Sequence, residues 1–301
     1  MSLLKKLKCL SGTKKVKTKL GTIEYISFGE GPTLLWVHGI LGGADQAYLF
    51  SQPLLSKGFR IVAISRFGYM DSPLPENSSP AAQADLYAAL LDTLNITKIS
   101  ILGFSAGGPS ALQFALRYPD RCSSLILLSA AVPPYKIPSR FIRLIARKFF
   151  GSDLIIWYLI NYFPSIMLKM MGVPKGVQKG LSDTDKKWLS DAMFAFLPVS
   201  SRIGGIVNDI CITNPDLNKQ YPYEKIAVPT LVIHAVDDPM PPFAIAKKIA
   251  ERIPHSKFVA VKSGGHLHIG HQSLLGSLIS KFIKEPETAR SSLTNESLTY
   301  Y

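Results

Sequence analysis

The sequence predicts an α/β domain with a mostly parallel sheet flanked by helices and with an inserted all-helical cap. Short, continuous apolar runs recur along the chain, as expected for strands that are buried on both faces. Helical segments such as residues 80–94 and 105–118 separate these runs, and this alternation favours parallel strands. The alternation stops between about residues 133 and 222, where the chain has several helical patterns interrupted by Gly and Pro.

The expected elements follow from local patterns. Each expected strand is a short apolar or alternating run, and these runs lie at 22–28, 33–37, 60–64, 99–102, 125–128, 230–233 and 257–261. Within the insert, Ser139 can cap a helix that separates apolar residues from arginines, and further helices are expected at 153–160, 183–197 and 201–211. An all-helical block between two sheet strands predicts a cap over an active site.

These patterns divide the chain into five parts. We expect a basic leader at 1–20, the first part of the core at 21–132 and the helical cap at 133–222. The second part of the core follows at 223–284, and the polar tail at 285–301 is expected to be disordered.

Composition narrows the class of protein. The 301 residues are 47% hydrophobic and 18% charged, which is typical of a globular protein. The three cysteines, Cys9, Cys122 and Cys211, show neither a disulfide framework nor zinc-ligand spacing, which favours a reducing compartment and a cytoplasmic location. We find no secretory signal and no uninterrupted apolar run of the roughly 18 residues that a membrane span needs. Nucleic-acid binding has no support beyond the net charge.

About half of the net charge of +13 lies in the leader. Its positive charges come from seven lysines without any acidic residue, Lys5, Lys6, Lys8, Lys14, Lys15, Lys17 and Lys19. A segment of this kind can be a solvated tail or can contact an anionic membrane surface, and the sequence leaves both open.

The most informative motif is a G-x-S-x-G pentapeptide formed by Gly103, Ser105 and Gly107. An apolar run precedes it and a helical pattern follows it. A serine on such a strand-to-helix turn needs small residues two positions away on each side, and its hydroxyl is raised clear of the sheet. The N–H groups at the helix start point at the same place. The motif therefore predicts Ser105 as a catalytic nucleophile.

A serine nucleophile needs a base, and the base needs an acid that orients it. When the serine comes first along the chain, the acid and then the histidine should follow later strands. Asp237 and Asp238 come directly after the run 230–233, and His266 follows 257–261 in a glycine-flanked turn. The order Ser, Asp, His therefore indicates a catalytic triad, with the choice between the two aspartates open at this point.

The chain resembles the α/β-hydrolase fold superfamily, in the branch that contains carboxylesterases and meta-cleavage-product hydrolases. The resemblance covers about residues 21–283 and rests on the pentapeptide, on His38-Gly39 and on the loop 66–73. The family's acid usually precedes a proline by four positions, which selects Asp238 because Pro242 follows it at that distance. The cap is the least specific part of the resemblance.

The resemblance implies a role for each site residue. Ser105 would attack the acyl carbon, His266 would take and return the proton, and Asp238 would fix the imidazole tautomer. Two backbone N–H groups would form the oxyanion hole, with Ala106 as one donor and Ile40 as the other, and with Leu41 as the competitor of Ile40. No cofactor is implied.

Other residues have simpler interpretations. The histidines at 266, 268 and 271 have a spacing that could bind a metal, but His266 is already assigned as the base, so we expect no metal site. His234 is expected to be a core histidine, and Asp71 and Ser72 are expected to shape a loop. The aromatic side chains at 157, 158, 162 and 163 are expected to form the core of the cap, although they could instead line an acyl pocket or meet a membrane.

These features predict a serine hydrolase that cleaves an ester or related acyl bond of a small, hydrophobic substrate through an acyl-enzyme. A carbon–carbon bond hydrolase and an acyltransferase use the same triad and are the alternatives. An anionic dienoate substrate would need an arginine in the pocket, for which Arg140, Arg143, Arg147 and Arg202 are the candidates. A ligand receptor or a membrane-surface lipid binder on the same scaffold is the non-enzymatic alternative. The oligomeric state is left open.

Overall fold

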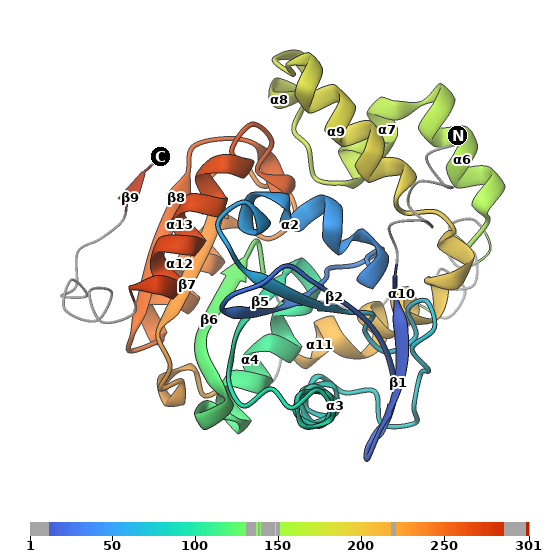
Figure 1. The fold of residues 1–301 in the computed structure, drawn as a ribbon. Helices are drawn as coiled ribbons and strands as arrows, with labels where there is room; N and C mark the ends of the chain where they lie inside the picture. The colour runs from blue at the N-terminus through green and yellow to red at the C-terminus, as the bar shows by residue number, and fades with distance from the viewer. Residues whose placement is uncertain are drawn as a thin grey trace.

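The protein is described by a computed structural model that covers residues 12–130, 137, 139, 148, 151–217, 221–285 and 299–300. Within these residues, strands β1 to β9 form one sheet in the order β1-β2-β4-β3-β5-β6-β7-β8-β9 (Figure 1). β2 is antiparallel to β1 and β4, and all other neighbouring strands are parallel. This confirms the predicted mostly parallel sheet. The strands are β1 (Lys14–Thr18), β2 (Gly21–Phe28), β3 (Thr33–Val37), β4 (Arg60–Ile64), β5 (Ile99–Phe104), β6 (Cys122–Leu128), β7 (Thr230–Ala235), β8 (Ser256–Val261) and β9 (Thr299–Tyr300).

Helices cover both faces of the sheet, because alternate residues of each central strand enter two separate cores. In β3, Leu35 and Val37 face one core, whereas Leu34 and Trp36 face the other. The first core contains α3 (Pro80–Thr93), α4 (Gly108–Arg117) and α12 (Phe243–Arg252), and the second contains α2 (Ala47–Leu55) and α13 (Gln272–Lys284). The continuous apolar runs of the sequence are explained by this double burial.

The helical insert forms the cap, and its helices α6 to α9 rise above the sheet in Figure 1, whereas α10 and α11 lie lower, between α4 and β1 in that view. Its described elements are α6 (Asp153–Tyr162), α7 (Pro164–Met170), α8 (Lys175–Lys179), α9 (Asp183–Phe194), α10 (Ile203–Asn208), the π-helical turn η5 (Asp209–Thr213) and α11 (Asn214–Asp216). The helix expected after Ser139 lies outside the described residues. A capping box between Ser182 and Asp185 starts α9, which explains why the chain turns into a helix at that point.

Short 3₁₀ turns connect the longer elements, and one of them carries the end of β5 into α4. They are η1 (Ala44–Gln46), η2 (Ser105–Gly107), η3 (Pro119–Arg121), η4 (Val199–Ser201), η6 (Tyr223–Lys225) and η7 (Gly265–Leu267).

Both ends of the sheet differ from the sequence prediction. The leader expected at 1–20 contains β1, an edge strand that pairs Val16 with Ile23 of β2. Exposed lysines suit an edge strand, because their charge hinders pairing with another chain. At the other edge β9, which lies in the tail expected to be disordered, pairs with β8. Residues 1–11 of the leader and residues 286–298 and 301 of the tail lie outside the described part of the chain.

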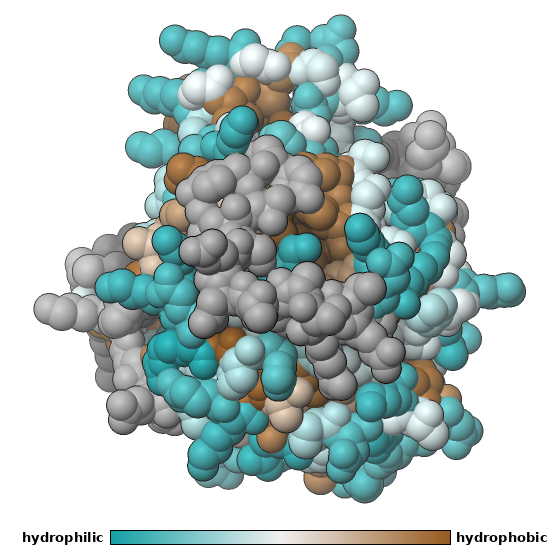
Figure 2. Space-filling model, turned by 90° about the vertical axis from the view of Figure 1, so that its left-hand side faces the viewer, coloured by the Kyte–Doolittle hydropathy of each residue, from teal (hydrophilic) through white to brown (hydrophobic). Residues whose placement is uncertain are grey.

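The aromatic residues of α6 do not form the core of the cap, and that expectation was wrong. Tyr162 is 62% exposed and Trp157 41% exposed, whereas Ile156 and Ile160 point into the cap. Hydrophobic residues also interrupt the hydrophilic surface on the face shown in Figure 2. None of the helices in the described ranges is long and apolar enough to cross a membrane.

Candidate active site

The turn between β5 and α4 holds Ser105 in a strained conformation. Its φ is 49°, in the left-handed region that costs a residue with a side chain roughly 1–3 kcal/mol. The flanking glycines are required by close packing. A Cβ on Gly103 would lie 2.8 Å from the Ala111 Cβ, and a Cβ on Gly107 would lie 2.4 Å from the Val37 carbonyl oxygen. The pentapeptide therefore forms the sharp turn that the sequence predicts.

The structure brings Ser105, His266 and Asp238 together. The Ser105 hydroxyl lies 2.9 Å from His266 Nε2, and His266 Nδ1 lies 2.8 Å from Asp238 Oδ2. Because a carboxylate only accepts hydrogen bonds, Nδ1 carries the proton and Nε2 is free to accept the serine proton. All three side chains are buried, which strengthens electrostatic contacts between them.

The two neighbouring aspartates have different contacts. Asp238 Oδ2 accepts from His266, and its Oδ1 accepts from the Met240 N–H at 2.8 Å. Asp237 instead accepts the backbone N–H groups of Gly265 at 2.9 Å and Gly264 at 3.2 Å. Asp237 thus holds the turn that carries His266, whereas Asp238 holds the imidazole itself.

Hydrogen bonds to the Gly39 carbonyl group hold the loop after β3 in place. The Gly39 carbonyl accepts from His38 Nδ1 at 2.6 Å, from the Gly42 N–H at 3.2 Å and from Arg66 Nη2 at 3.2 Å. The backbone N–H of Arg66 donates to His38 Nε2, so Nδ1 is the protonated nitrogen of this ring. Burial, and then the Arg66 guanidinium, lower the pKa of His38 well below its usual value, so this ring stays neutral.

This arrangement separates the two candidates for the second oxyanion donor. In a trans peptide the N–H points away from the preceding C=O, so the Ile40 N–H points away from the groups that hold the Gly39 carbonyl. This orientation of the Gly39–Ile40 peptide favours Ile40 as the donor. Ile40 and Leu41 both line the same cavity as Ser105.

Two buried arginines fasten the cap to this loop, and the sequence analysis did not find this role. Arg66 makes two hydrogen bonds to Asp209 of η5, at 2.6 and 2.5 Å, and both side chains are fully buried. Arg202 binds Asp45 at 2.6 Å and the Gly42 carbonyl at 2.7 Å. The partners are more than 140 residues apart in sequence, so no local pattern pairs them.

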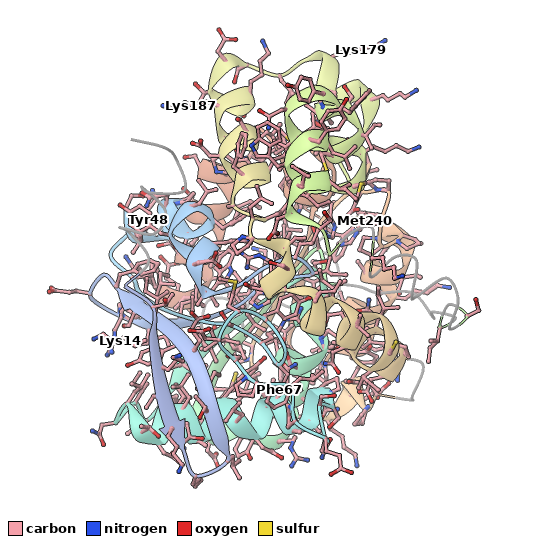
Figure 3. All side chains as sticks on the ribbon, turned by 90° about the vertical axis from the view of Figure 1, so that its right-hand side faces the viewer. Lys14, Tyr48, Phe67, Lys179, Lys187 and Met240 are labelled. Carbon is pink, nitrogen blue, oxygen red and sulfur yellow. The ribbon has the colours of Figure 1, made fainter. Side chains whose placement is uncertain are left out.

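The cavity beside Ser105 is apolar and has a volume of about 60 Å³. The cap contributes Met167, Met170, Met171 and Phe196 to its lining. Met240 also lines it and lies where the cap meets the core, whereas Lys179 and Lys187 point away from it at the far end of the cap (Figure 3). Among the described residues, no lysine, arginine, aspartate or glutamate lines this cavity. The described lining of the cavity is therefore mostly apolar.

Of the arginines considered for an anionic substrate, Arg202 is the one that the structure describes, and it does not line the cavity. Arg202 is fully buried in its contacts with Asp45 and the backbone. Arg140, Arg143 and Arg147 lie outside the described residues.

Two further histidines, His234 and His268, lie close to the site. His234 is buried, its Nε2 lies 3.0 Å from the Pro241 carbonyl oxygen and 3.6 Å from Asp238 Oδ2, and burial lowers its pKa. His268 contacts Ser129, which donates to the His266 carbonyl. Over the described ranges, no three His, Cys, Asp or Glu side chains are close enough together to hold a metal ion.

The loop 66–73 has a structural role. Ser72 Oγ accepts from the Glu24 N–H at 2.9 Å and donates to the Ser65 carbonyl at 2.6 Å. Asp71 forms an exposed ion pair with Lys15 of β1 at 3.2 Å. Neither residue lines the cavity beside Ser105, as expected for residues that shape a loop.

The parallel sheet, the strained serine turn and the helical cap define an α/β hydrolase. Residues 32–154 match the family model for the alpha/beta hydrolase fold, and residues 205–294 match a model for TAP-like proteins. The chain therefore belongs to the α/β-hydrolase superfamily and is an enzyme.

Several named proteins are similar to it. An uncharacterized hydrolase, YcgS of Bacillus subtilis, is 27% identical over 88% of this chain and 95% of its own length. A 2-hydroxy-6-oxononadienedioate/2-hydroxy-6-oxononatrienedioate hydrolase of Pseudomonas putida is 34% identical, over 41% of this chain and 47% of its own.

Solved structures share the fold. An alpha/beta hydrolase fold protein from Nakamurella multipartita has a TM-score of 0.76 at 24% identity, covering 91% of this chain and 100% of its own. The esterase EaEST from Exiguobacterium antarcticum has a TM-score of 0.63 at 21% identity, covering 90% of this chain and 99% of its own. The relatives thus include both esterases and carbon–carbon bond hydrolases.

Proposed function

We propose that the protein is a serine hydrolase that cleaves an ester, or a related acyl bond, of a neutral hydrophobic substrate through an acyl-enzyme on Ser105. The observation that carries this proposal is the hydrogen-bonded chain from Ser105 through His266 to Asp238 beside an apolar cavity. Such a chain supplies a nucleophile, a base and a group that orients the base.

Each step of the reaction has a residue to perform it. His266 Nε2 takes the proton of the Ser105 hydroxyl while Oγ bonds to the acyl carbon. The Ile40 and Ala106 N–H groups stabilise the developing oxyanion, and removing one such donor typically costs roughly 3–4 kcal/mol of transition-state stabilisation. The protonated His266 then gives its proton to the leaving alcohol. In the second half His266 takes a proton from the water that attacks the acyl carbon, and it returns that proton to Ser105 Oγ as the bond from Oγ to the acyl carbon breaks and the acid leaves.

A fluorophosphonate probe tests this assignment without knowledge of the natural substrate. Wild type should be labelled covalently, and Ser105→Ala should not be labelled while it keeps the circular dichroism spectrum of the wild type. Ser110→Ala is the matched control, because Ser110 is also buried in the adjacent helix but lies outside the cavity. Labelling that persists in Ser105→Ala would exclude Ser105 as the nucleophile.

The lining favours an ester over the carbon–carbon bond of an anionic dienoate. Such a substrate brings a carboxylate into the site, and an unpaired buried charge is costly. No cationic side chain among the described residues lines the cavity. We therefore expect p-nitrophenyl esters of apolar acids to be hydrolysed, and a meta-cleavage product to be a poor substrate by comparison.

The exposed face of α6 favours a second candidate function, contact with a membrane surface. Leu154 is 74% exposed, Tyr158 50% and Tyr162 62%, and aromatic residues of this kind are enriched at membrane–water interfaces. We expect Ser105→Ala protein to bind anionic vesicles in a salt-sensitive manner and Tyr158→Ser/Tyr162→Ser protein to lose most of that binding. Equal binding by both proteins would exclude this face as the contact.

A further inference from the structure

The end of helix α7 in the cap has a defined backbone geometry. The helix ends at Met170, and Gly172 follows it with a φ of 73°. The Gly172 N–H donates to the Lys169 carbonyl at 3.1 Å. The Val173 N–H donates to the Leu168 carbonyl at 2.9 Å. These two bonds form a Schellman motif, which closes the helix and holds the Gly172 backbone in the left-handed conformation.

This end of the cap contacts the turn that carries the candidate catalytic base. The Gly172 carbonyl accepts the backbone N–H of His266 at 2.9 Å. Because His266 is only 5% exposed, its N–H needs a partner inside the protein, and the cap supplies it. A Cβ on Gly172 would lie 2.5 Å from the His266 Cβ, and a Cβ on Gly265 would lie 2.4 Å from the Gly172 carbonyl oxygen. Close packing therefore requires glycine on both sides of the contact.

The core holds the carbonyl side of the same histidine. The His266 carbonyl accepts from Oγ of Ser129, the residue that follows β6, at 3.1 Å. Ser129 Oγ in turn lies 3.0 Å from His268 Nε2. Ser129 and His268 are buried and have φ values of 49° and 50°, a conformation that persists only where surrounding contacts hold it. The backbone of His266 is thus held between the sheet and the cap, with a hydrogen bond to each.

The position of this backbone determines where the imidazole lies. Nε2 and Nδ1 of His266 must reach Ser105 and Asp238 at the same time, and they do so at 2.9 and 2.8 Å. A displacement of about 1 Å in such an arrangement can lower a rate roughly 10²-fold. Met167 and Met170 of α7 line the cavity beside Ser105. The helix that forms part of the cavity therefore also holds the base.

We propose that Gly172 of the cap is a positioning residue for the catalytic base, and that its carbonyl group keeps His266 Nε2 within hydrogen-bond distance of Ser105. The inference rests on the proposed hydrolysis at Ser105, because that proposal assigns His266 as the base. The cap is then part of the catalytic machinery as well as a cover, since the site is complete only while the end of α7 lies against the His266 turn.

Gly172→Ala tests the proposal, with Gly58→Ala as the matched control. The two glycines have nearly the same φ, 73° and 76°, so an alanine is strained to a similar extent at both. The Cβ at position 172 meets His266, whereas the Cβ at position 58 meets nothing within 4 Å. We expect kcat of Gly172→Ala for p-nitrophenyl acetate to fall about tenfold or more, with KM within about threefold of wild type. Gly58→Ala should behave as wild type does.

The split between kcat and KM separates positioning of the base from shaping of the cavity. A residue that only shaped the cavity would change KM for long acyl chains and leave kcat for the acetate ester unchanged. A displaced base instead lowers kcat by a similar factor for acyl groups from C2 to C8. Calorimetric titration with ethyl octanoate should give dissociation constants within about threefold for Ser105→Ala and Ser105→Ala/Gly172→Ala. Wild-type kcat in Gly172→Ala, or a change confined to KM and binding, would overturn the proposal.

A second variant reaches the same contact from the side of the core. If Gly172→Ala does not keep the circular dichroism spectrum of wild type, Gly265→Ala replaces it, because its Cβ meets the Gly172 carbonyl oxygen. The same loss of kcat is expected. Gly270→Ala is the control on this turn, since Gly270 has a φ of 82° and open space around its Cβ, and it should keep the kcat of wild type.

Hydrogen exchange of the His266 amide tests the contact without any substrate. In Ser105→Ala protein followed by NMR, this amide should exchange about tenfold faster or more when Gly172→Ala is added, and no faster when Gly58→Ala is added. Unchanged exchange together with unchanged kcat would overturn the positioning role and leave the proposed hydrolysis in place. Absence of hydrolysis of every ester by wild type, with faster exchange in the Gly172→Ala protein, would overturn the hydrolysis and leave the contact between cap and His266 supported.

Discussion

The buried pair of Arg66 and Asp209 gives the prediction that depends most on the folded structure. Asp209→Asn keeps the volume of the side chain but removes the charge that balances Arg66. Both side chains are fully buried and joined by two hydrogen bonds. Leaving one partner of such a pair unbalanced destabilises a protein by roughly 3–5 kcal/mol.

That loss is a large part of the stability of a typical domain, which is roughly 5–15 kcal/mol. At roughly 2–4 °C per kcal/mol for a large domain, the melting temperature should fall by about 6–20 °C. Urea unfolding followed by tryptophan fluorescence gives the free energy directly, and differential scanning calorimetry gives the temperature. Asp183→Asn is the control, because Asp183 forms an ion pair with Lys186 on the surface of the same cap and is 98% exposed. Surface pairs of this kind contribute little, so this variant should unfold as wild type does.

The same substitution should also affect catalysis. Arg66 holds the Gly39 carbonyl as well as Asp209, so a displaced guanidinium loosens the peptide that presents the Ile40 N–H. We expect kcat of Asp209→Asn for a p-nitrophenyl ester to fall more than tenfold at a temperature where the variant is folded, with a smaller change in KM. Unfolding and kinetics like those of Asp183→Asn would refute the role assigned to this pair.

Three further predictions follow from individual contacts. Asp238→Asn should lower kcat by roughly 10³–10⁴-fold, and Asp237→Asn by much less because it only holds the turn before His266; ester kinetics compare them, and the reverse order would contradict the assignment. The folded pKa of His268 is about 3 against 6.5 unfolded, so the unfolded chain binds the proton first and stability is lost as the pH falls from about 6.5 towards 3. In His268→Gln the free energy of unfolding should therefore change less steeply with pH, by about 1.4 kcal/mol per pH unit. Urea unfolding between pH 6 and 4 measures this slope, and the same slope as in wild type would show that His268 is protonated in the folded state. Gly107→Ala should lose fluorophosphonate labelling because its Cβ meets the Val37 carbonyl, whereas Gly176→Ala, with open space around it, should label as wild type does; labelling of both would contradict the packing of the serine turn.

Local patterns in the sequence predicted the sheet and the placing of the site residues. The central strands are short apolar runs, and Ser105, Asp238 and His266 each follow the end of such a run within a few residues, where the carboxyl ends of parallel strands meet. The glycines next to Ser105 and His266 provide the turn signals. These features depend on neighbours in sequence, so a single chain is enough to find them.

Contacts between distant segments could not be predicted in the same way. Arg66 lies in the loop 66–73, which was recognised only by its resemblance to the family, and its partner Asp209 lies in the helical insert. No periodicity or spacing connects two residues so far apart. The exposure of Trp157 and the pairing of the lysine-rich β1 with β2 are equally non-local, because both depend on which face packs against the rest of the molecule.

The account stands on covalent catalysis by Ser105, and acid quenching followed by mass spectrometry tests it most directly. The protein is mixed with an excess of a p-nitrophenyl ester that it hydrolyses, quenched within seconds and digested. We expect the acyl mass on the peptide that contains Ser105, and neither adduct nor turnover in Ser105→Ala. An acyl group on another residue, or turnover in Ser105→Ala equal to that of wild type, would contradict the account.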